Sequence, residues 1–67
     1  MTINTIIEGK EQKITANKEV LLWLCKRLDV AAEGLHDTGY EALATSARQV
    51  SMDICDALVD AGVLDKL

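Results

Sequence analysis

The chain has 67 residues, of which 49% are apolar and 27% charged, so it suits one small domain and is too apolar for a disordered tail. Seven lysines and arginines against eleven aspartates and glutamates give a formal net charge of −4, which argues against the basic footprint typical of nucleic-acid-binding proteins. A core this small barely offsets the entropy lost on folding. The apolar excess therefore predicts self-association.

Residues 1–16 are expected to form an N-terminal arm that precedes a helical domain at 17–67. Isoleucines mixed with β-branched threonines in residues 2–7 favour an extended strand. Glu8-Gly9-Lys10 is typical of a turn, and a short return strand can follow it. The pattern leaves open whether the arm is a hairpin, an edge strand or a frayed segment.

The first helix is predicted over residues 18–33. Asn17 is a good N-cap, and apolar residues then recur in alternating steps of four and three. Gly34 is expected at the position just after the helix, where glycine commonly ends helices.

The second helix is predicted over residues 39–61. Thr38 and Glu41 fit a capping box, in which each side chain caps the other's backbone N–H. Gly62 is expected to end the helix, with Val63 folding back on Leu58. The predicted core and dimer seam of the two helices comprises Leu21, Cys25, Leu28, Leu35, Leu43, Ala47, Val50, Ile54 and Leu58.

The short connection between these helices predicts an antiparallel helical hairpin and an all-α fold class. Two copies are expected to dimerise into a four-helix bundle, which buries the apolar excess. Small residues along one flank of the second helix would let it pack closely against the same helix of a second copy. These residues are Ala44, Ala47, Ser51 and Cys55.

The two cysteines are predicted to be reduced thiols. A turn near residue 36 pairs positions whose numbers add to about 73, which separates Cys25 from Cys55 by about 10 Å along the helix axis. A disulfide needs Cα atoms within about 7 Å, so a bridge within one chain is excluded. Residues 1–4 do not resemble the start of a secretory signal, and with two thiols they predict a cytoplasmic protein.

Each predicted helix carries a second apolar stripe opposite its seam. Trp23 and Val30 lie on the back of the first helix, and Met52 and Val59 on the back of the second. One hypothesis is that the isoleucines of the arm cover Trp23. The other is that these side chains bind a foreign protein, since Trp and Met are enriched at interfaces.

Acidic residues on the second helix form a predicted ridge of Asp53, Asp56 and Asp60, extended by Asp65. Such a ridge can keep an apolar protein in solution, or it can imitate a phosphate backbone and occupy a basic groove. The candidate partner-binding residues are Trp23, Val30, Met52, Asp53, Asp56 and Asp60.

Candidate catalytic groups are sparse. His36 and Asp37 are neighbours in a predicted loop without an adjacent nucleophile, and one histidine with two cysteines lacks the spacing of a metal site. We therefore predict a protein that is not an enzyme and needs no metal or cofactor. Lys26, Arg27 and Arg48 form a small basic cluster, which keeps open an alternative Rop-like regulator that binds RNA or DNA.

Residues 20–32, VLLWLCKRLDVAA, and residues 54–60, ICDALVD, resemble segments of small uncharacterised helical-hairpin proteins of pseudomonads. The resemblance implies a hairpin and a dimer but no reaction. In size and acidity the chain also resembles phage-encoded inhibitors, such as anti-CRISPR and quorum-sensing anti-activator proteins. The resulting hypothesis is a non-enzymatic homodimeric module that inhibits or regulates a host protein by occupying its surface. An antitoxin-like or structural interaction module is a further alternative.

Overall fold

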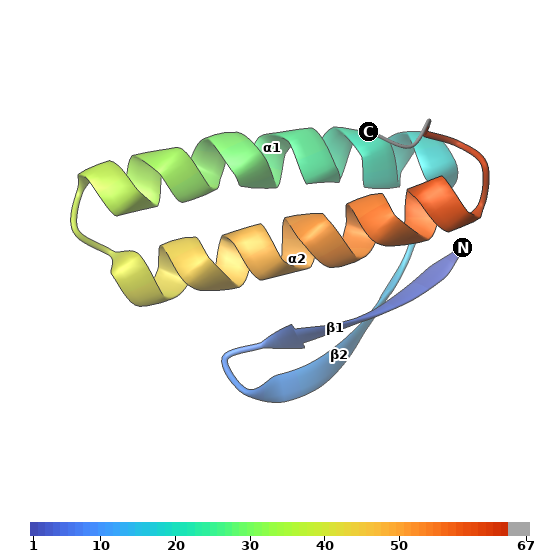
Figure 1. Ribbon diagram of the computed structural model, residues 1–67. Helices are drawn as coiled ribbons and strands as arrows, with labels where there is room; N and C mark the ends of the chain where they lie inside the picture. The colour runs from blue at the N-terminus through green and yellow to red at the C-terminus, as the bar shows by residue number, and fades with distance from the viewer. Residues whose placement is uncertain (65–67) are drawn as a thin grey trace.

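The computed structural model describes residues 1–64 and contains two strands followed by two helices (Figure 1). The elements are β1 (Thr2–Ile7), β2 (Lys10–Thr15), α1 (Lys18–Asp37) and α2 (Glu41–Asp60). The prediction of an all-α fold and of a four-helix bundle is wrong, because the arm forms a two-stranded antiparallel sheet and the chain has an α+β fold. Asp65, the predicted end of the acidic ridge, lies outside the described residues.

The arm is a β-hairpin with a two-residue turn. Its strands pair from Thr2 with Thr15 to Ile7 with Lys10, which leaves Glu8 and Gly9 between them. Both turn residues have positive φ, 51° and 79°, as a type I′ hairpin turn requires. The alternation of the strand turns Ile3 and Thr5 inward, where both are buried.

The N-terminus of α1 is the one that the sequence predicts. The Asn17 side chain accepts a hydrogen bond from the Val20 backbone N–H at 2.9 Å, so the predicted cap is confirmed. The helix does not end at Gly34, however, and continues for almost another turn to Asp37.

Thr38 ends α1 and does not begin α2, so the predicted capping box is wrong. Its hydroxyl and its backbone N–H both donate to the Gly34 carbonyl, at 2.8 and 3.2 Å. The left-handed glycine that ends the helix is Gly39, with φ of 89°. Tyr40 stands at the N-cap of α2 without a side-chain capping bond.

The C-terminus of α2 follows the prediction closely. Gly62 has φ of 76°, and the Val63 N–H donates to the Leu58 carbonyl at 2.9 Å. Val63 also packs against the core, so the predicted glycine stop with a folded-back valine is confirmed.

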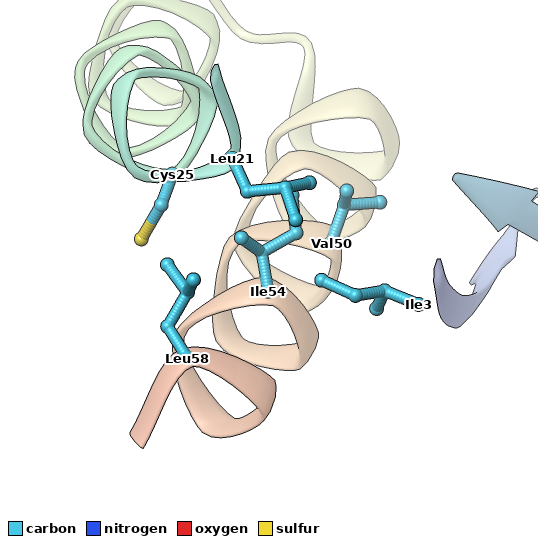
Figure 2. Packing of buried hydrophobic residues seen from close by; sticks show 6 residues of the cluster. All are labelled: Ile3, Leu21, Cys25, Val50, Ile54 and Leu58. Carbon is cyan, nitrogen blue, oxygen red and sulfur yellow. The ribbon is translucent and has the colours of Figure 1, made fainter. Parts of the chain in front are cut away.

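Helix α2 is the central element of the fold. Figure 1 shows it between α1 and the β-hairpin, and α2 contacts both. Six buried apolar side chains from these three elements form one cluster at the core (Figure 2): Ile3, Leu21, Cys25, Val50, Ile54 and Leu58.

The part of the predicted seam nearest the helix–helix turn is not core. Leu43 is 45% exposed, and Leu28, Leu35 and Ala47 are half-buried. Leu43 lies in the first turn of α2, whereas the β-hairpin lies under the middle and C-terminal part of that helix (Figure 1). The predicted close packing of small residues against a second copy is also wrong, because Ser51 is buried against α1 of the same chain.

The β-turn gives a test of this hairpin. Glu8 adopts a left-handed conformation that asparagine tolerates better, so Glu8→Asn is expected to stabilise the fold by about 0.5 kcal/mol. Gly9→Ala should instead destabilise it by more than about 1 kcal/mol, since alanine resists positive φ. Urea unfolding followed by circular dichroism measures both. Equal stability of all three proteins would contradict the assigned turn.

Candidate functional site

The position of the helix–helix turn sets which residues of α1 and α2 face one another. With the turn centred near Gly39, facing positions have numbers that add to about 78 instead of 73. Cys25 and Cys55 come within reach, with their Cα atoms 6.4 Å apart, and they are joined by a disulfide. The exclusion of an intrachain bridge is therefore wrong, and its cause is the false helix end at Gly34.

Ser51 adds a polar contact beside this disulfide. Its buried hydroxyl lies 2.7 Å from a carboxylate oxygen of Asp29 and 3.1 Å from the carbonyl oxygen of Cys25, so its one proton serves both acceptors. Cys25 is buried as well. The disulfide and this hydroxyl together hold α1 on α2.

Asp53 links α2 to the β-hairpin by a hydrogen bond, as Ser51 links α2 to α1. One of its carboxylate oxygens accepts a hydrogen bond from the buried Thr5 hydroxyl at 2.7 Å, and the other accepts one from the Gln49 amide at 3.0 Å. Asp53 is thus engaged by the hairpin and by Gln49, although its spacing puts it on the same side of α2 as Asp60. An open hollow of about 550 Å³ adjoins it, lined by Asn4, Thr5, Ile6, Gly9, Glu11, Gln49 and Asp53.

The other two aspartates of the predicted ridge, Asp56 and Asp60, share a face of α2 with Met52 and Val59. We call these four residues the α2 outer face. The spacing of these residues puts them on one side of the helix. Met52 is 59% exposed, Val59 is half-buried, and both aspartates are exposed. Within residues 1–64 neither aspartate has an ion-pair partner, so their charges face solvent.

A second exposed face lies on the other helix, and we call it the α1 outer face: Val20, Trp23, Arg27 and Val30. Trp23 and Val30 are 60% and 63% exposed. The Arg27 guanidinium lies 5.7 Å from the centre of the Trp23 ring, in a cation–π contact. Among the described elements the hairpin contacts α2 and not α1, so the hypothesis that its isoleucines cover Trp23 is wrong.

The other candidate groups are dispersed. The helix register brings Arg48 level with residue 30, about one turn of helix from Lys26, so the predicted basic cluster is spread out. His36 Nδ1 lies 2.7 Å from Glu41 Oε1, linking the end of α1 to the start of α2. Residues 1–64 contain no group of three or more His, Cys, Asp or Glu side chains placed to hold a metal ion.

Comparisons with protein-family models, with curated proteins and with solved structures found no match to this chain. The resemblance to the pseudomonad proteins and to phage-encoded inhibitors thus stays a prediction. No helix in the described part of the chain has the length and apolarity needed to cross a membrane.

Sequence reasoning missed the polar contacts that position the two outer faces. Thr5 and Ser51 stand where the apolar pattern of their strand and helix would place a buried residue. A polar residue at such a position needs a hydrogen-bond partner, which was the available signal. The partners themselves, Asp53 and Asp29, are distant in sequence and follow only from the fold.

The disulfide gives a quantitative prediction. The disulfide joins cysteines with a sequence separation of 30 residues. It is expected to stabilise the fold by about 3.5 kcal/mol, because it lowers the conformational entropy of the unfolded chain. The variant with Cys25→Ala and Cys55→Ala should lose about this much, measured by urea unfolding. Wild-type protein unfolded in a phosphine reductant serves as the control and should lose a similar amount. Unchanged stability in both experiments would contradict the pairing.

Proposed function

We propose that this chain is a non-catalytic module that regulates or inhibits another protein by occupying a basic surface on it. The carrying observation is the α2 outer face, on which Met52 is 59% exposed beside Asp56 and Asp60. The flexible thioether of methionine adapts to an opposing surface, and the two carboxylates select one that is positively charged.

The charge of the whole chain supports this proposal. A formal net charge of −4 repels acidic surfaces and nucleic acid and speeds encounter with basic ones. Asp53 is outside the proposed contact, since both of its carboxylate oxygens accept hydrogen bonds within the chain.

The cysteines and the histidine, which are the candidate chemical groups, have structural partners. Cys25 and Cys55 bond to each other, and His36 contacts Glu41 across the helix–helix turn. We therefore assign the function to surface recognition. We also propose the cytoplasm as its place of action. The disulfide removes the support that reduced thiols would have given this proposal, and in the cytoplasm the bridge would depend on the burial of Cys25 for protection from thiol reductants, since Cys55 is half-buried.

The proposal is tested with the triple variant Met52→Ala, Asp56→Asn and Asp60→Asn. Immobilised wild-type chain should capture a protein from host extract; after identification and purification, that protein should bind the variant at least tenfold more weakly in calorimetry. Binding to the wild type should also weaken as salt is raised from about 0.1 to 0.5 M, because exposed charges are screened.

The matched control alters a similar set of side chains on the β-hairpin, Ile6→Ala with Glu8→Gln and Glu11→Gln, all exposed in the structure. This control should bind the purified protein as the wild type does. If the triple variant and the control bind it equally well, the α2 outer face is not the contact surface and the proposal fails.

A further inference from the structure

The α1 outer face repeats with the period of a helix–helix interface. Val20, Trp23, Arg27, Val30 and Gly34 follow one another in alternating steps of three and four residues, the spacing with which two α-helices pack along their length. Leu24 and Ala31 flank this row on one side, and Lys26 and Glu33 flank it on the other.

Gly34 is a residue that the fold of a single chain does not need. It lies inside α1, and its φ is not in the left-handed range that favours glycine. Apart from its chain neighbours and the adjacent backbone of α1, a Cβ atom built on it meets no atom of residues 1–64 within 4 Å. A helix with glycine in its interior is less stable than the same helix with alanine there. Gly34 therefore lowers the stability of α1, and no contact within the described part of the chain offsets this loss. A neighbouring surface that approaches the bare backbone would supply the benefit.

We propose that the α1 outer face binds the same face of a second copy, with the two α1 helices antiparallel about a two-fold axis. In the register that sets Arg27 opposite Val30 of the second copy, Trp23 comes opposite Gly34 of the second copy. The indole ring then occupies the space that a side chain at residue 34 would fill. The symmetry makes each of these contacts twice.

Charge favours this register over the antiparallel registers one heptad away and over a parallel arrangement. Here Lys26 flanks Glu33 of the second copy, and the symmetry repeats the pair. Sliding the helices by one heptad sets Lys26 against Lys26 in one direction and Glu33 against Glu33 in the other. A parallel arrangement in register sets Arg27 against Arg27. The flanking residues Lys26 and Glu33 thus meet as unlike charges in the proposed register, with the two Arg27 side chains on adjacent layers beside the two-fold axis, whereas each of these alternatives sets like charges directly opposite each other.

The dimer goes beyond the proposed function and uses a different surface. Its contacts come from α1, whereas Met52, Asp56 and Asp60 belong to α2. Two copies of the α2 outer face therefore remain exposed in the dimer. Failure of one proposal leaves the other standing, because each is tested by variants on a separate helix.

Sedimentation equilibrium tests the dimer at about 1–500 µM chain, a range that detects dissociation constants up to about 1 mM. Wild-type protein should show a monomer–dimer equilibrium. Lys26→Glu and Glu33→Lys should each weaken dimerisation about tenfold by setting like charges against each other, and the double variant should restore it. Lys13→Glu makes the same charge change on β2, where the side chain is exposed, and should leave the equilibrium unchanged.

Two variants test the contact between Trp23 and Gly34. Trp23→Ala should weaken the dimer at least tenfold while the chain stays folded by circular dichroism, since the ring is exposed in the monomer. Gly34→Ala should raise the urea midpoint of the monomer but weaken the dimer several-fold, because its methyl group displaces the ring. A chain that stays monomeric at about 500 µM overturns the proposal. So does a dimer that the single charge changes leave intact, that the double variant does not restore, or that Gly34→Ala strengthens.

Discussion

The rest of the structure depends on the register between α1 and α2. Thr38 bonds back to the Gly34 carbonyl and Gly39 reverses the chain, so the turn falls almost a helical turn later than a stop at Gly34 would put it. This position brings Cys25 beside Ser51 and within bonding distance of Cys55. It also brings Leu21 into the core with Ile54 and Leu58 (Figure 2). A different register would expose part of this small core.

Helix α2 is packed on two sides by different chemistry. Toward α1 it presents Ser51 and Cys55, and toward the β-hairpin it presents Val50 and Asp53. Each contact includes a directional bond as well as apolar packing, which by itself constrains orientation weakly. In the described part of the chain no buried side-chain nitrogen or oxygen lacks a hydrogen-bond partner. The scaffold is thereby held well enough to present a defined outer surface despite its size.

The two outer faces differ in a way that suits different partners. The α2 outer face joins an exposed methionine to two exposed carboxylates, which suits a basic protein surface. The α1 outer face contains Trp23 and two valines, and Lys26 and Glu33 flank it. In an antiparallel dimer the Lys26 of each copy lies beside the Glu33 of the other, which suits a self-complementary contact. Because the faces lie on different helices, a dimer formed through α1 would leave both copies of the α2 outer face available to a partner.

The sequence by itself determined the features that local interactions control. Asn17 starts α1 and Gly62 ends α2 because the capping side chain and the left-handed glycine act within a few residues. The outward position of Trp23 and Met52 also follows from helical geometry alone. Only the tertiary structure decided the rest. Gly34 and Gly39 are both plausible helix stops, and the structure uses Gly39. That choice moves the register by several residues, enough to decide whether two cysteines distant in sequence meet.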